Sequence, residues 1–311
     1  MKRYLIKRIL ISVVTLLVIL LVLFMLLEFM PGSPFNDEKL SAEQVEVLKQ
    51  KYGLDKPVIV RFLRYVWNMF KGDLGVSYAI SVDTPITSLI ANRFPVTMKI
   101  GFMSLLFGTL AGVTLGLLAA FFKNKVIKVI YYVLTIVGIS VPSYLLAMLF
   151  SYFLGYKLEI FGLLYDFRSP VSTSVMPVMA LSFMVMAIIG QFTKSEAQEA
   201  MKSDYVLLAR CQGMSNGTVL LKYILRNSLI PVITVVAGLL VGLLTGSLVI
   251  EQMFSIPGIG GLLTQAIGSN DFSVVLALCF IYSALYIVVM LILDIVYCVI
   301  DPRVRLGKKA A

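Results

Sequence analysis

Long apolar runs, each of about 20 residues or more, dominate the pattern of this chain. A run of about 20 apolar residues is long enough to cross the hydrocarbon core of a bilayer as a helix. The runs lie at Ile9 to about Met30 and at about residues 95–122, 129–155, 174–193, 229–250 and 273–300. The pattern therefore predicts an all-α integral membrane protein with six transmembrane helices.

The first run has the position of a signal peptide, but its length favours an uncleaved helix. The apolar core of a signal peptide is only about 7–15 residues long and is followed by a small-residue cleavage site. The run here is longer and leads into Glu28 and Pro31. We therefore expect a first transmembrane helix whose amino terminus lies in the cytoplasm.

Prolines lie within or at the start of three of the later runs, at Pro142, Pro177 and Pro231. A proline kinks or begins a helix, and neighbouring helices in a membrane protein satisfy the backbone groups that it frees. These prolines therefore do not exclude the runs from the membrane.

A polar insertion separates the first two runs. Within it, the segments Ser41–Tyr52 and Pro57–Lys71 mix apolar and charged residues at helical spacing, which predicts two short helices. We expect residues 1–30 to form the cytoplasmic start and first helix, residues 31–93 an extracytoplasmic helical cap, and residues 94–311 the core transmembrane domain.

The net charge of +10 is explained by membrane topology. The proposed cytoplasmic segments carry sixteen of the 27 Lys and Arg residues but only four of the 17 Asp and Glu residues. Cytoplasmic loops of membrane proteins carry such an excess of cations. We therefore place both termini and the loop at residues 194–228 in the cytoplasm, and the charge requires no nucleic-acid partner.

The residue types argue against catalysis by this chain. It contains no histidine, and its three cysteines lack the spacing of metal ligands. The glycine-rich loop ending in Gly-Lys-Ser or Gly-Lys-Thr, which holds nucleotide phosphates, is also absent from the sequence. We expect a non-catalytic subunit without a cofactor or metal, so any ATP that drives it is bound by another polypeptide.

The loop between the fourth and fifth runs has a pattern of its own. Ser203 precedes a short amphipathic segment, Gly213 stops it, and Ser215 precedes a second one. Serine is a common helix cap, and glycine readily takes the left-handed conformation at a helix end. The pattern predicts two helices joined by a sharp elbow, although an amphipathic linker would have a similar pattern.

The residues of this loop resemble the coupling loop of ABC importer permeases, and the closest match is the peptide and nickel permease family. Leu207 and Leu208 stand where the general form has Glu-Ala, and these departures resemble one of the two permease types of the peptide group. The resemblance implies that the following residues form the contact with an ATPase: Glu199, Asp204, Tyr205, Ala209, Arg210, Gly213, Met214 and Arg226.

Motifs along nearly the whole chain share this resemblance. They are Pro31-Gly32, Gly53-Leu54-Asp55-Lys56-Pro57, Gly72-Asp73-Leu74-Gly75, Ser140-Val141-Pro142-Ser143, the segment from Glu251 to Gly260, and the segment from Asp294 to Arg305. Each motif alone is weak evidence for the resemblance, but their order within six apolar runs is specific to the family. The expected fold is that of a type I ABC importer permease.

The resemblance implies a pore-forming permease in a prokaryotic cell membrane that imports oligopeptides or dipeptides by alternating access. Its implied partners are a homologous second permease, two ABC ATPases that hold ATP and Mg, and an extracytoplasmic solute-binding protein. Nickel complexes or glycosides are alternative substrates. An ion-coupled secondary transporter would show inverted repeats and carboxylates near the midplane of the membrane. A sensor or scaffold would need a soluble output domain.

Further candidate residues lie in the last two runs. Gly238, Gly242 and Gly246 recur every four residues, so they share a helix face that permits close packing or lines the pore. Glu251 is either an interfacial carboxylate or part of a gate. The carboxyl-terminal motif, which we expect to be structural, comprises Asp294, Tyr297, Asp301 and Arg303.

Overall fold

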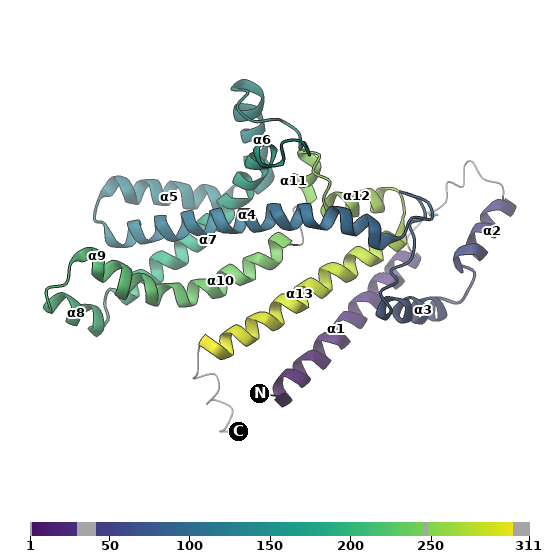
Figure 1. Cartoon of the computed structure of the whole chain (residues 1–311), viewed down its shortest axis with the longest axis horizontal. Coiled ribbons are helices and arrows are strands. Elements are labelled where there is room, and N and C mark those ends of the chain that lie inside the picture. The colour runs from purple at the N-terminus through teal and green to yellow at the C-terminus, as the bar shows by residue number, and fades with distance from the viewer. Residues whose placement is uncertain (1, 30–41, 245–247, 301–311) are drawn as a thin grey trace. The chain divides into compact units, whose positions relative to one another are not determined.

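The computed structural model describes residues 2–29, 42–244 and 248–300 (Figure 1). Within these ranges the regular structure is helical, and the one β-bridge joins Val76 and Pro85. The chain divides into two compact units. Unit 1 comprises Met1–Val96 and Pro257–Val288, and unit 2 comprises Thr97–Ile256 and Val289–Ala311.

Unit 1 contains the first and last long helices and the polar insertion. Its helices are α1 (Lys2–Phe29), α2 (Ala42–Tyr52), α3 (Val58–Phe70), the start of α4 (Ile86–Phe121), α12 (Ile259–Gly268) and most of α13 (Phe272–Ile300). Its core includes Leu20, Met69, Ile86, Leu262 and Leu278, all buried. The two predicted helices of the insertion are confirmed as α2 and α3.

Unit 2 contains the remaining part of α4 and the helices up to residue 256. These are α5 (Lys125–Ser140), α6 (Ser143–Phe150), the π-helix η1 (Ser151–Lys157), α7 (Pro170–Ala200), α8 (Asp204–Cys211), α9 (Asn216–Thr218), the π-helix η2 (Val219–Leu225), α10 (Arg226–Leu244) and α11 (Leu248–Met253). Pro177 and Pro231 lie inside α7 and α10.

Helices that are long and apolar enough to cross a membrane agree with the predicted runs. Four are continuous within the described residues, and the number rises to six if each of two bent pairs counts as one span. In the first bent pair, α5 and the α6–η1 segment meet at 110°. The predicted run 129–155 is therefore not one straight helix. Pro142 disfavours a helical conformation at Val141, whose backbone is extended (φ −92°, ψ 119°).

Helices α4 and α7 pack closely against each other within unit 2. Gly108, Gly112 and Gly116 share one face of α4. A Cβ atom at Gly112 would lie 2.7 Å from the carbonyl oxygen of Met186. A Cβ atom at Gly116 would lie 2.6 Å from the carbonyl oxygen of Gly190. Only glycine allows the two helices to approach this closely, as is common between membrane helices.

This contact predicts different effects for two glycine substitutions. Gly112→Ala forces the helices apart and should destabilise the fold by about 1–3 kcal/mol, the usual cost of overpacking. Gly238→Ala in α10 should be neutral or slightly stabilising, because its Cβ would meet no heavy atom within 4 Å and alanine favours the helix. Thermal unfolding of the purified chain in detergent compares the two variants. Equal unfolding temperatures for the two variants would contradict the close contact between α4 and α7 at Gly112.

Candidate functional site

The predicted elbow at Gly213 is confirmed. Gly213 has a φ of +76°, in the left-handed region. Its N–H donates to the carbonyl of Arg210 at 2.9 Å, and the N–H of Met214 donates to the carbonyl of Ala209 at 3.2 Å. These two bonds form a Schellman motif, in which a glycine ends the helix and the chain turns sharply.

The helix starts on either side of the elbow differ in how they are capped. Helix α8 begins after Ser203 as predicted, but its side chain does not cap the helix, because its hydroxyl donates to the carbonyl of Ala200 at 2.5 Å. The prediction for Ser215 is confirmed, since its oxygen accepts from the N–H of Thr218 at 3.3 Å. The chain then continues as helix from α9 through η2 into α10.

One side of the elbow is packed firmly onto unit 2. Val206 and Ala209 of α8, together with Ile224 of η2, are at most 2% exposed. They share a core cluster with Leu117 of α4 and Ala197 of α7. Figure 1 shows α8 and α9 at the end of unit 2 where α4 gives way to α5. A linker without a fixed position would not bury these side chains, so the elbow is a rigid extension of α4 and α7.

The other side of the elbow presents apolar side chains to solvent. Leu207 is 61% exposed, Leu208 60% and Tyr205 39%. Of the remaining predicted contact residues, Met214 is half-buried, and those that are exposed are Glu199, Asp204, Arg210, Gly213 and Arg226. The elbow thus brings most of the predicted residues to one segment, with Ala209 on its buried side.

Glu251 of α11 is buried rather than at a solvent interface. Its side chain is 3% exposed, and its Oε1 accepts a hydrogen bond from the Thr97 hydroxyl at 2.7 Å. Both residues belong to unit 2. A role in gating stays a prediction.

A buried carboxylate that sequence reasoning missed organises the turn after α3 in unit 1. One oxygen of Asp271 accepts hydrogen bonds from the Ser77 hydroxyl at 2.5 Å and from the backbone N–H groups of residues 78–80 at 3.0–3.2 Å. Asp271 follows Asn270, which ends α12 with a φ of +54°. This bonding fixes the turn after α3 to the junction between α12 and α13.

The same turn is tied to α2 at the surface. Asp83 accepts from the Lys51 ammonium at 2.7 Å and from the Tyr52 hydroxyl at 2.9 Å. The hydrogen bonds from Lys51 and Tyr52 hold the pKa of Asp83 below its usual value. The Tyr52 ring also lies 4.5 Å from that of Tyr78, measured between centroids. The described part of the cap, residues 42–93, therefore has polar contacts of its own.

Two family matches cover almost the whole chain. Residues 112–306 match the binding-protein-dependent transport system inner membrane component, and residues 1–101 match the N-terminal part of such components. The chain belongs to this family. The first match contains the elbow, and the second contains α1 and the cap.

Family members with assigned names are similar over their full length. A dipeptide transport system permease protein, DppB, of Lactococcus lactis subsp. cremoris is 41% identical over 98% of this chain and 100% of its own length. DppB of Bacillus subtilis is 34% identical over 99% of this chain and 100% of its own. An oligopeptide permease protein, OppB, of Haemophilus influenzae is 33% identical over 98% of this chain. This member of the family is therefore a multi-pass membrane protein similar to transport permeases.

Other predicted residues of this family member are placed only in part. Gly238 and Gly242 lie on α10, and a Cβ at either position would meet no heavy atom within 4 Å. Asp294 and Tyr297 lie on α13, although only their backbone is described. Gly246, Asp301 and Arg303 lie outside the described residues.

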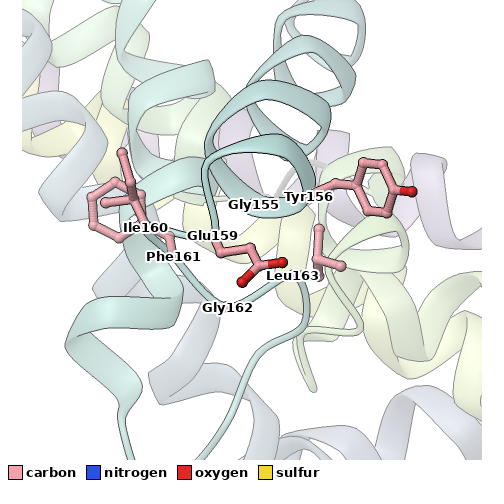
Figure 2. Close-up of a pocket in the computed structure, with 7 residues that line it drawn as sticks. All are labelled: Gly155, Tyr156, Glu159, Ile160, Phe161, Gly162 and Leu163. Atoms are coloured by element: carbon pink, nitrogen blue, oxygen red, sulfur yellow. The ribbon is translucent and has the colours of Figure 1, made fainter.

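The loop after η1 lines an open pocket of about 390 Å³ in unit 2. Figure 2 shows the carboxylate of Glu159 among apolar side chains, with Ile160 and Phe161 on one side and Tyr156 and Leu163 on the other. Glu159 itself has a φ of +50°. The pocket combines an apolar lining with a single charged group, and it is open to solvent because Glu159 and Tyr156 are exposed.

Proposed function

We propose that this chain is the pore-forming permease subunit of an ATP-driven importer that takes up dipeptides or oligopeptides. The observation that carries the proposal is the 41% identity, over the full length, to a protein named as a dipeptide transport system permease. The aligned region spans 98% of this chain and therefore includes the elbow, the cap and the transmembrane helices. A shared substrate class is the simplest explanation of similarity over the full length.

The elbow gives the proposal a mechanism. Its exposed apolar residues, Tyr205, Leu207 and Leu208, offer a surface that fits a groove on a partner ATPase. Its buried side is continuous with the core at Leu117 and Ala197. A force applied at α8 is therefore passed to α4 and α7 as a rigid-body movement, which requires no chemistry in the permease.

Under this proposal the remaining components lie on other polypeptides. Two ATPase subunits hold ATP and Mg and carry out hydrolysis, so this chain is not an enzyme. A homologous second permease completes the pore, and Gly238 lies on an exposed face of α10 where a partner helix could approach closely. A solute-binding protein delivers the peptide to the cap.

The proposed orientation places both termini and the elbow in the cytoplasm and the cap outside. Its support is the excess of Lys and Arg over acidic residues in the segments assigned to the cytoplasm. This orientation puts the elbow on the side of the membrane where ATP is available.

Native Cys211 tests the orientation, because it is exposed at the elbow. With Cys279 and Cys298 replaced by alanine, an impermeant maleimide should label Cys211 only after intact cells are permeabilised. In the control, Cys211 is also replaced and exposed Asp55 of the cap becomes cysteine, which should be labelled without permeabilisation. Labelling of Cys211 in intact cells would place the elbow outside the cell and contradict the proposed orientation.

Gly213→Val tests the coupling. A β-branched residue at positive φ is strained by on the order of 1 kcal/mol or more, so the elbow should bend differently. We expect normal membrane levels, since the apolar helices are unchanged, and a parallel loss of peptide uptake and of transport-stimulated ATPase activity in the reconstituted transporter.

Two control variants separate backbone strain from the added side chain. Asparagine tolerates the left-handed conformation, so Gly213→Asn should keep most of the transport activity. Gly217→Val adds the same valine in the helical turn of α9, where a Cβ meets no heavy atom within 4 Å, and it should also transport normally. Full transport by Gly213→Val would show that the bend at this elbow is not needed for coupling.

A further inference from the structure

Helix α3 carries an apolar stripe that faces away from the rest of unit 1. The stripe consists of Ile59, Leu63, Trp67 and Phe70, which are 66%, 61%, 64% and 66% exposed. Their spacing of three or four residues places them on one side of the helix. A neighbouring side of the helix packs onto the core of unit 1 through Phe62, Tyr65, Val66 and buried Met69. Four large apolar side chains in a row are costly to leave in water.

The contacts of α3 fix its level relative to the membrane. The ring of Phe62 lies 5.6 Å from the ring of Phe24 in α1, measured between centroids. Arg61 binds the carboxylate of Glu28 at 2.7 Å. Because the apolar span of α1 ends at Phe29, these contacts lie within its last two turns. Helix α3 therefore packs where the hydrocarbon core gives way to the headgroups.

The charges around the stripe suit an anionic or zwitterionic membrane surface. Helix α3 contains no acidic residue. Arg64 is exposed, and the Lys71 ammonium lies 5.0 Å from the centroid of the Trp67 ring. Tryptophan prefers the level of the lipid headgroups, and cations beside an apolar face attract lipid phosphates.

We propose that α3 is an interfacial helix that lies in the leaflet at the carboxyl end of α1, with its stripe among the upper acyl chains of the lipids. The helix crosses no bilayer and instead anchors the cap to the membrane surface. Its contacts with Phe24 and Glu28 set its depth. This placement uses only the position of the α1 span, so it does not depend on what the protein transports.

The single tryptophan of the chain provides the test. The purified full-length chain is reconstituted into phosphatidylcholine and phosphatidylglycerol vesicles that contain lipids brominated at known acyl carbons. We expect blue-shifted Trp67 emission, strong loss of that emission with bromines near the headgroups, weaker loss with bromines near the bilayer centre, and little quenching by acrylamide in the water.

A matched control moves the tryptophan to α2. Val47 is 64% exposed, the same fraction as Trp67, but it lies on a largely polar helix. In Trp67→Phe/Val47→Trp we expect red-shifted emission that acrylamide quenches and brominated lipids do not. If this variant does not fold, the measurement on Trp67 in the wild-type chain still tests the proposal.

Two outcomes would overturn the proposal. In one, acrylamide quenches Trp67 as strongly as the control tryptophan, and brominated lipids leave its emission unchanged. In the other, Trp67 is exposed to acrylamide until a tryptophan-free solute-binding protein is added, which would assign the stripe to a protein contact instead of to lipid.

Discussion

The close approach of α4 to α7 positions the surface of unit 2 that receives the elbow. Because water is absent from the bilayer core, two apolar helices gain little there from the hydrophobic effect. Close van der Waals packing must therefore hold them together. Gly112 and Gly116 bring the two backbones into direct contact. At the end of the same pair, Leu117 and Ala197 receive the side chains of the elbow. The elbow therefore packs on a helix pair whose spacing is set by Gly112 and Gly116.

In unit 1, polar contacts join α1, α2 and α3 to the turn after α3 and to the start of α13. Asp271 gathers four donors from the turn after α3, and Asp83 ties α2 to the same turn. Arg61 and Glu28 join α3 to α1. Hydrogen bonds to a buried carboxylate are directional and costly to break, so they fix the shape of this segment. Unit 1 thus combines an apolar core with a set of polar contacts around the turn after α3.

Most of the helices could be predicted from local sequence patterns, because the length of an apolar run, prolines, glycines and helix caps act within a few residues. The elbow at Gly213 and helices α2 and α3 are of this kind. Contacts between distant segments were missed. Gly108 to Gly116 and Gly238 to Gly246 have the same four-residue spacing, but only the α4 set meets a neighbouring backbone among the described residues. Ser77 and Asp271 are 194 residues apart, and no local pattern pairs them.

We propose that ATP hydrolysis on partner subunits drives peptide import through this chain. The most direct measurement is the accumulation of a labelled dipeptide in proteoliposomes that contain this chain, the second permease, the ATPases and the solute-binding protein. The account predicts accumulation that requires ATP on the side of the elbow and that stops when this chain is omitted. Accumulation driven by a proton or sodium gradient without ATP would contradict it.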